Sequence, residues 1–419
     1  MRASDVFKPQ GTPTVTLVKE PIDQRASQRF DNAIEDGGKL IRVIGPSKSG
    51  KTVFVTYKRG TGDIIRVSAS GVKEGADLWT RVLASAGGAD QVVKTVAIGG
   101  AAGVEVSAKA SAGVLIAKAE TEGKVKVEAN GSKATAQSMA RDPLHSVVQL
   151  LRGQDVWVFI DDFHYLKPEI QEELAEQIKY AAEENVQLII ALIPGRSEDI
   201  LQANSDIRGR ILDIAFDYWD VGELSLIAET GFPSLGVRLP PGSAAQLAQE
   251  AAGTPQLMQA ICLELAREVG AREAFDPPQE LDLSAELKQS VFRNLAETSA
   301  DFSTTVSQMK KGPPTRGTPR KSYTVAGGQQ RDVYELLVKA FGMNPPQLKL
   351  TTDEIQARVD ALAGEEVASV WESVRHMSLI ANGMNKSPLL DFGGDLKWVS
   401  ILDPYLLFAL RWGDESPAA

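Results

Sequence analysis

Apolar runs of five or six residues recur through the first half of the chain, each bounded by polar or glycine-rich segments. The runs at 40–44, 156–160 and 187–192 are almost continuously apolar, which is typical of strands that are covered on both faces. An amphipathic helix is expected between the last two, at 168–184. Such alternation of strands and helices predicts a parallel sheet with helices on both of its faces, and therefore an α/β fold.

The pattern differs in two other regions. Residues 91–135 alternate between apolar and polar positions in short stretches punctuated by glycine, which predicts a β-rich insertion, with an irregular loop as the alternative. Near the C-terminus, three expected helices begin at about 331, 351 and 365 and precede two strands around 389–392 and 396–399. Three helices followed by a β-hairpin is the element order of a winged helix.

Composition narrows the class of protein. The chain has 419 residues, a net charge of −10 and a sequence pI of about 5.1, which argues against bulk coating of nucleic acid. Cys262 is the one cysteine, so no intrachain disulfide forms. Neither an apolar leader at the N-terminus nor a run of 18 apolar residues occurs in the sequence. We therefore expect a cytoplasmic protein that does not associate with membranes.

A phosphate-binding loop follows the first strand. The segment matches G-x-x-x-x-G-K-[ST] in full and comprises Gly45, Pro46, Ser47, Lys48, Ser49, Gly50, Lys51 and Thr52. Glycines let the backbone N–H groups curl around phosphate oxygens, and the following helix offers its positive end. Lys51 is expected to reach the β- and γ-phosphates of a nucleoside triphosphate, and Thr52 to ligate Mg²⁺.

Two acids end the apolar run at 156–160. Asp161 is expected to hold Mg²⁺ opposite the loop, and Asp162 to orient or deprotonate the attacking water. The alternative is that an acid only caps the strand end, which applies more to Asp162 than to Asp161. Lys51 and Asp161 are far apart in the sequence, and the insertion at 91–135 explains that distance.

Three arginines and one proline complete the candidate site. Arg196 follows the strand at 187–192 and is a candidate sensor of the γ-phosphate, the alternative being a solvated loop arginine. Arg208 and Arg210 precede the strand at 211–214. In ring-forming ATPases an arginine at such a position reaches a neighbour's γ-phosphate, and Arg210 is the stronger candidate; a surface salt bridge is the alternative. Pro255 is expected to pack on adenine or only to begin a helix.

Taken in order, these motifs resemble bacterial STAND-type ATPases of the AAA+ superclass, in an arrangement near that of Orc/Cdc6-like proteins. The resemblance covers most of the chain except 91–135 and 303–327. It rests on the lead from Asp5 to Lys19, the P-loop, Ile160 to His164, Pro194 to Arg196, Arg208 to Ile211, Trp219 to Leu224, Gly253 to Leu257 and Ile401 to Leu407.

The resemblance implies a switch that is closed with ADP and forms homo-oligomers with ATP. It also implies that Val18 and Pro255 contact the nucleotide, and that adenine is preferred over guanine. Because the sequence shows neither an effector domain nor a repeat sensor, we expect an effector or sensor protein to act in trans. Many relatives act in antiviral defence or signalling.

The expected division has five parts. They are an N-terminal lead at 1–36, a P-loop ATPase domain at 37–235 with the insertion at about 91–135, a helical lid domain at 236–300, a flexible linker at 301–327 and a winged-helix domain at 328–419.

Charge separates the candidate functions. From residue 327 onward the chain has eight Lys or Arg and thirteen Asp or Glu, a net charge of −5. Such a module is poorly suited to the phosphates of DNA, which favours protein contact. A regulatory ATPase that acts on a partner effector is therefore the leading hypothesis. A DNA-associated helper ATPase of transposition or initiation, and a nucleotide-binding scaffold with negligible turnover, are the alternatives.

Overall fold

The computed structural model describes residues 1–18, 24–86, 142–193, 208–299, 302–315, 317, 319–385, 388–393 and 397–413. The expected insertion at 91–135 and Arg196 lie outside these residues. The chain divides into two compact units. Unit 1 comprises Met1–Pro21, Pro46–Gly50 and Asp217–Ala419, and unit 2 comprises Ile22–Gly45 and Lys51–Phe216. Two boundaries between the units therefore fall within the P-loop, one after Gly45 and one after Gly50.

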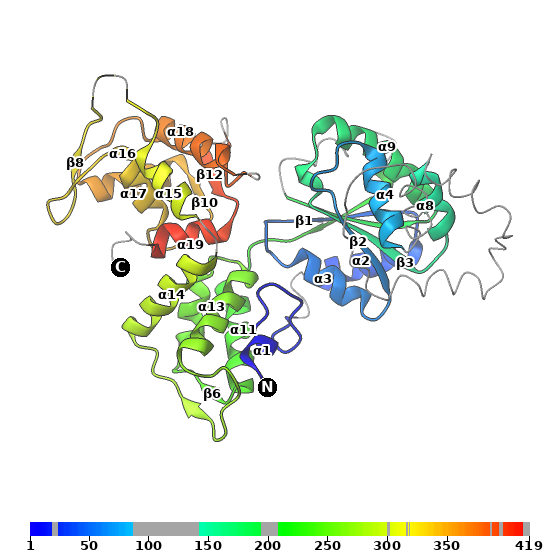
Figure 1. Cartoon of the computed structure of the whole chain (residues 1–419), viewed down its shortest axis with the longest axis horizontal. Helices are drawn as coiled ribbons and strands as arrows, with labels where there is room; N and C mark the ends of the chain where they lie inside the picture. The colour runs from blue at the N-terminus through cyan, green and yellow to red at the C-terminus, as the bar shows by residue number, and fades with distance from the viewer. Residues whose placement is uncertain are drawn as a thin grey trace, which may run out of the picture. The chain divides into compact units, whose positions relative to one another are not determined.

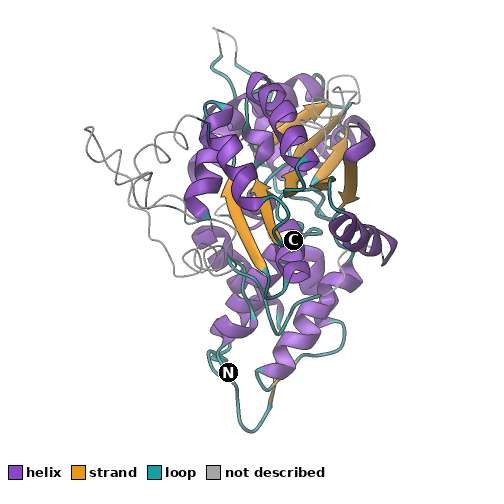
Figure 2. Ribbon diagram, turned by 90° about the vertical axis from the view of Figure 1, so that its right-hand side faces the viewer, coloured by secondary structure: helices purple, strands orange, loops and turns teal. Residues whose placement is uncertain are grey.

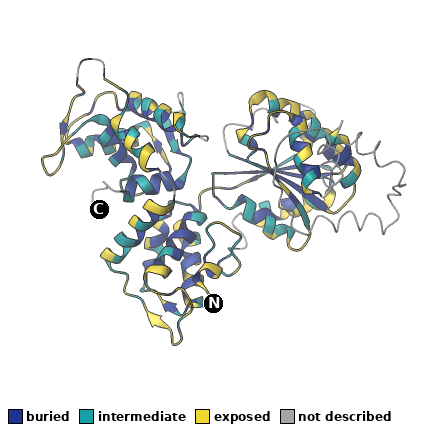
Figure 3. Cartoon of the chain, viewed as in Figure 1, coloured by how far each residue is buried: buried dark blue, intermediate teal, exposed yellow. Residues whose placement is uncertain are grey.

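Unit 2 contains a five-stranded parallel sheet in the order β2-β3-β4-β1-β5. The strands are β1 (Leu40–Ile44), β2 (Asp63–Ser68), β3 (Val156–Asp161), β4 (Gln187–Leu192) and β5 (Ile211–Ala215). Every residue of β1 is buried, as are five of the six residues in β3 and in β4. These strands appear dark blue in Figure 3. The parallel α/β sheet expected from the apolar runs is confirmed.

Helices cover both faces of this sheet (Figures 1 and 2). Alternate residues of β3 enter different cores, because side chains of a strand alternate between faces. Trp157 and Phe159 pack with Phe30 of α2 (Gln24–Asp36) and Phe54 of α3 (Lys51–Arg59). Val158 and Ile160 belong to the other core, whose helices are α4 (Gly75–Ser85), α8 (Pro143–Leu151) and α9 (Pro168–Glu183).

One ion pair crosses the sheet. Arg42 lies in the middle of β1 with a fully buried side chain, opposite Asp213 of β5. Its Nε donates to Asp213 Oδ1 at 2.7 Å and its Nη2 to Oδ2 at 2.6 Å. A buried guanidinium is tolerated when a carboxylate accepts in this bidentate geometry. The pair therefore ties β5 to β1 in one register.

Unit 1 is mainly helical. Its first part comprises α1 (Ala3–Val6), α11 (Val221–Ser234), α12 (Ser243–Glu250), α13 (Pro255–Glu268) and α14 (Ala285–Ser299), with the strands β6 (Val237–Arg238) and β7 (Gln279–Glu280). The second part comprises α15 (Ser303–Lys311), α16 (Val333–Phe341), α17 (Thr352–Ala363), α18 (Val370–Gly383) and α19 (Pro404–Trp412), with the strands β8 (Tyr323–Thr324), β9 (Gln330–Arg331), β10 (Lys349–Thr351), β11 (Leu390–Gly393) and β12 (Trp398–Ile401).

The C-terminal module, α16 to α19, has an antiparallel sheet in the order β10-β12-β11. Capping boxes begin two of its helices, at Asp332 with Glu335 and at Thr351 with Glu354. The order of α16, α17, α18, β11 and β12 is the one expected from the apolar pattern, but β10 was not expected and α18 begins at Val370 rather than at about 365. We use the term C-terminal module for this part.

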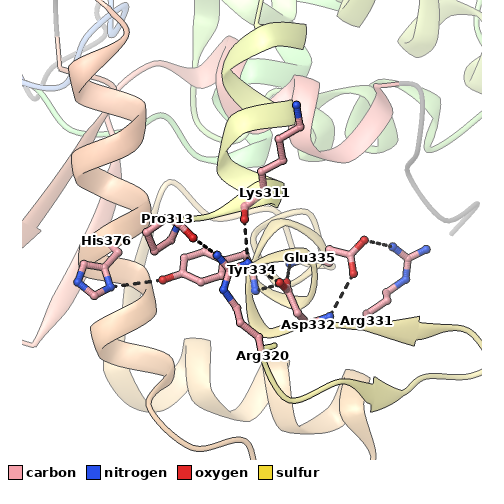
Figure 4. A network of polar contacts seen from close by, with 8 residues as sticks. All are labelled: Lys311, Pro313, Arg320, Arg331, Asp332, Tyr334, Glu335 and His376. Carbon is pink, nitrogen blue, oxygen red and sulfur yellow. Dashed lines mark hydrogen bonds and ion pairs between the residues drawn. The ribbon is translucent and has the colours of Figure 1, made fainter. Parts of the chain in front are cut away.

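The segment before this module is anchored to it (Figure 4). Arg320 donates to the carbonyl of Lys311 at 2.8 Å and to Asp332 Oδ2 at 2.6 Å, and it also donates to the carbonyl of Pro313. Its guanidinium lies 4.5 Å from the ring centroid of Tyr334, whose hydroxyl is 3.3 Å from His376 Nδ1. The segment 301–327, expected as a flexible linker, thus contains α15 and a fixed arginine.

We expect Asp213→Asn to lower the free energy of unfolding by about 2 kcal/mol, because the fully buried Arg42 would lose the charge of its partner, whose own side chain is 42% exposed. Urea denaturation followed by far-UV circular dichroism measures the change. Asp36→Asn is the matched control, since it removes the exposed ion pair with Lys39 and should cost less than about 1 kcal/mol. Equal effects of the two substitutions would show that the buried pair has no special role.

Candidate functional site

The backbone of the P-loop requires glycine at both ends. A Cβ on Gly45 would lie 2.5 Å from the carbonyl oxygen of Phe216, so no side chain fits there. Gly50 has a φ of +98°, which other residues rarely adopt. Lys48 also lies in the left-handed region, with a φ of 63°. The chain then enters α3 at Lys51, so the loop ends at a helix N-terminus, where anions bind favourably.

Lys51 is buried at that N-terminus. Only 9% of the residue is exposed, and its Nζ donates to the carbonyl of Gly45 at 2.7 Å. Burial lowers the pKa of Lys51 to about 8, although Asp161 and Asp162 act in the opposite direction. At neutral pH the ammonium is therefore still protonated. A buried, protonated ammonium beside a helix N-terminus is suited to phosphate.

The two expected metal ligands are in contact. Thr52 Oγ1 donates to Asp161 Oδ2 at 2.9 Å, which joins the first turn of α3 to the end of β3. A hydroxyl and a carboxylate oxygen suit Mg²⁺, which typically takes one or two carboxylates and completes its shell with water and substrate phosphate. Within the described ranges, no group of three or more His, Cys, Asp or Glu side chains is placed to hold a metal ion. The residues therefore fit Mg²⁺ bound together with phosphate.

Asp162 is held in an unusual conformation. Its φ is 61°, and its backbone N–H donates to Asp161 Oδ1 at 2.9 Å. Ser68, at the end of the neighbouring strand β2, donates through Oγ to Asp162 Oδ2 at 2.8 Å. Burial raises the pKa of Asp162, and the hydrogen bond from Ser68 partly offsets that rise. A carboxylate with a raised pKa is a better proton acceptor.

The sequence motifs give Ser68 no role, yet the sequence carries a signal for it. The mainly apolar run at 64–67 directly precedes Ser68, and the carboxyl ends of parallel strands share one edge of a sheet. In the structure, Ser68 is the register partner of Asp161.

Unit 1 packs around the middle of the P-loop. Trp219 donates through Nε1 to the carbonyl of Ser49 at 3.0 Å, and its backbone N–H donates to the carbonyl of Gly253 at 3.0 Å. A Cβ on Gly50 would lie 3.8 Å from Trp219 Cζ2 and 4.0 Å from Pro255 Cγ. Pro255 thus begins α13 beside the loop. The sequence motifs alone give Trp219 no individual role.

Val18 and Arg210 are the remaining candidates whose side chains the structure describes. Val18 is partly buried against the core of unit 1. Arg210 is exposed and its Nε lies 3.8 Å from Glu183 Oε1, in a surface ion pair. It directly precedes β5, and a Cβ on Gly38, just before β1, would lie 3.8 Å from Arg210 Nη1. Arg210 is therefore at the amino edge of the sheet, whereas Thr52 and Asp161 are at the carboxyl edge.

Arg208 lies in a short 3₁₀ turn (Arg208–Arg210), but its side chain is outside the described part of the chain, as is Arg196. Among the helices that the structure describes, none is long and apolar enough to cross a membrane.

The parallel sheet, the complete P-loop and the acids that end β3 define a P-loop NTPase fold. No family model matches the chain, and no curated protein matches it.

Among solved structures, a Walker-type ATPase of Pyrococcus abyssi is similar at 13% identity and a TM-score of 0.49, over 95% of this chain and 100% of that one. The RuvB Holliday junction branch migration motor of Thermotoga maritima has 13% identity and a TM-score of 0.41, over 92% and 94% of the two chains. Cdc6p of Pyrobaculum aerophilum has 14% identity and a TM-score of 0.39, over 97% of each chain. TM-scores below 0.5 do not establish a common fold.

We expect one lysine to titrate with a pKa of about 8 when the Cε positions are labelled with ¹³C and followed by NMR. Lys51→Arg assigns the resonance by removing it. Asp161→Asn should lower that pKa further, because the buried ammonium would lose a nearby negative charge. If all lysines titrate together in the range of exposed ones, Lys51 is not desolvated as described.

Proposed function

We propose that this protein is an ATPase of the AAA+ superclass, most similar in its motifs to STAND-type switches, that binds and hydrolyses ATP with Mg²⁺. The observation that carries the proposal is the grouping of Lys51, Thr52, Asp161 and Asp162 at one edge of the parallel sheet. These four side chains supply a buried cation, two oxygen ligands and a base. That set matches the chemical requirements of phosphoryl transfer to water.

In this mechanism the Lys51 ammonium binds the β- and γ-phosphates and stabilises the charge that develops on them. Thr52 Oγ1 and Asp161 would hold Mg²⁺, which would neutralise phosphate charge when bound. Asp162 orients a water and accepts its proton as the water oxygen bonds to the γ-phosphorus. The bond from that phosphorus to the β–γ bridging oxygen breaks, and ADP and phosphate are the products. Ser68 positions the Asp162 carboxylate through its hydrogen bond.

Pro255 and Val18 are proposed to contact the adenine. The support for Pro255 is its position beside Gly50, at the start of α13.

The proposal includes a switch that assembles into a homo-oligomer with ATP and regulates a partner effector, in signalling or antiviral defence. Arg210 is the residue proposed to act on a neighbouring copy, and the support for this role is its exposure on the surface. We interpret the C-terminal module as a winged helix. Its excess of acids favours a protein partner over DNA.

We expect Asp162→Asn to reduce ATP turnover about 100-fold because the attacking water loses its base. Binding should persist, with a Kd within about threefold of the original, since the amide keeps the shape of the carboxyl. A fluorescent nucleotide titration and a coupled phosphate-release assay measure the two quantities. Asp155→Asn, directly before the other end of β3, is the matched control and should leave both unchanged.

Lys51→Ala is the third variant to compare, and it should abolish nucleotide binding. Unchanged turnover in Asp162→Asn would remove the water-activating role from that residue.

We expect Arg210→Ala to reduce turnover about 1,000-fold at every protein concentration, because the neighbouring site would lose a cation. Mixing Arg210→Ala with Asp162→Asn should restore activity, since the second variant supplies the arginine and the first supplies an intact site. Glu183→Ala controls for the loss of the surface ion pair. Turnover measured across concentrations, together with sizing in ADP and in a non-hydrolysable ATP analogue, reports assembly. Full activity of Arg210→Ala would exclude a trans-acting role.

A further inference from the structure

The P-loop contains a second lysine whose position the proposed chemistry does not explain. Lys48 donates through Nζ to both carboxylate oxygens of Asp403, at 2.7 Å and 2.8 Å. The same ammonium lies 4.4 Å from the ring centroid of Tyr405, which adds a cation–π contact. The side chains of Lys48 and Asp403 are 23% and 27% exposed, so the pair is partly shielded from water. All three residues belong to unit 1.

Asp403 is fixed where it meets Lys48. It is the N-cap of α19, and its Oδ1 accepts from the backbone N–H of Tyr405 at 2.9 Å. Its carboxylate therefore cannot follow the ammonium freely if the loop changes conformation. Lys48 is also in the left-handed region, where a lysine is disfavoured, so the loop conformation that makes this contact needs compensating interactions.

The other end of α19 is fixed as well. Arg411, 4% exposed, donates through Nε and Nη2 to the two carboxylate oxygens of Glu250 at 3.0 Å and 2.8 Å. Trp412 Nε1 donates to Glu250 Oε2 at 2.8 Å. Glu250 is the last residue of α12. One helix of nine residues thus holds the P-loop lysine at its start and the first helical part of unit 1 at its end.

We propose that Lys48 and Asp403 form a latch that holds the P-loop against α19, and that a nucleoside triphosphate opens it by drawing the Lys48 ammonium to its phosphates. This inference rests on the proposed nucleotide site. A polyphosphate carries more negative charge than one carboxylate, so it competes for the ammonium when it enters the loop. Opening releases the start of α19 while Arg411 and Glu250 keep its end attached. The nucleotide state of the loop is thereby communicated to the C-terminal module.

The test uses Asp403→Asn, which removes the charge but keeps a side chain that caps helices equally well. We expect its affinity for a fluorescent non-hydrolysable ATP analogue to rise about fivefold, because the nucleotide no longer competes with an ion pair worth about 1 kcal/mol. Asp142→Asn is the matched control: Asp142 is also a helix N-cap, at α8, and should leave affinity unchanged. Lys48→Gln combined with Asp403→Asn completes a double-mutant cycle, in which the two effects should not add.

A second measurement does not depend on nucleotide binding. Hydrogen exchange of Pro404–Trp412 should be faster in Lys48→Gln than in the original protein, and Lys48→Arg should restore protection. In the original protein, the ATP analogue should raise exchange there, whereas in Lys48→Gln it should change nothing further.

The outcomes separate the two proposals. Unchanged or weaker binding of the analogue by Asp403→Asn would overturn the latch, since the pair would then be neutral or would support the binding-competent loop. If the original protein and Asp403→Asn both fail to bind nucleotide, the proposed function fails. In that case, the hydrogen exchange of Pro404–Trp412 still tests the latch. If Lys48→Gln leaves this exchange unchanged, the latch is overturned as well. If Lys48→Gln makes the exchange faster, Lys48 and Asp403 do hold α19, but a nucleotide does not open the latch.

Discussion

The carboxyl ends of β1 and β3 lie at one edge of a parallel sheet, and the candidate site depends on that constraint. Strand β4 lies between them, so the helix that follows β1 faces the acids that end β3 across one strand. The contact of Thr52 with Asp161 at 2.9 Å is the direct result. Residues more than 100 positions apart meet because parallel strands all present their carboxyl ends to one side. The bidentate pair of Arg42 and Asp213 keeps β5 in register with the strand that leads into the P-loop.

Burial changes the pKa of both a cationic and an acidic side chain in this site. It lowers the pKa of Lys51 and raises the pKa of Asp162, so each group is shifted toward its neutral form. The shifts are limited because the ammonium is near two acids and Ser68 donates to one of them. The result is a lysine that is protonated at neutral pH and a carboxylate with increased basicity. Binding of phosphate and activation of water require these two properties in the same small volume.

The sequence predicts the local parts of the site better than the contacts between distant segments. The P-loop, the strand at 156–160 and Asp161 follow from short-range pattern, because a tight phosphate loop and a buried strand have strict local requirements. The contacts of Ser68, Trp219 and Asp403 do not, since each of these residues belongs to a segment whose position depends on tertiary packing. Trp219 contacts Ser49 from 170 positions away and Asp403 contacts Lys48 from 355.

The segment 301–327 is a second case in which contacts cannot be predicted from the sequence. Its glycines, prolines and basic residues are typical of a linker, and the sequence favours one. Arg320, within this segment, donates to three residues. Of these, only Asp332, which lies beyond the segment, is recognisable as a partner from its residue type, because the other two accept through backbone carbonyls. Composition gives no sign of a side chain that binds main-chain oxygens.

The two lysines of the P-loop differ in a way that separates binding from its control. Lys51 is buried and its nearest charges, Asp161 and Asp162, belong to the site. The electrostatic free energy of its ammonium therefore changes little unless phosphate enters the loop. Lys48 is partly exposed, and its nearest charge is the Asp403 carboxylate, a helix cap in the C-terminal module. The free energy of this ion pair therefore changes whenever that module moves. A loop of eight residues with both kinds of lysine has one group that fixes affinity and another that makes affinity depend on a distant segment. Because only two residues, Ser49 and Gly50, separate them, a change in the backbone at one lysine is close to the other.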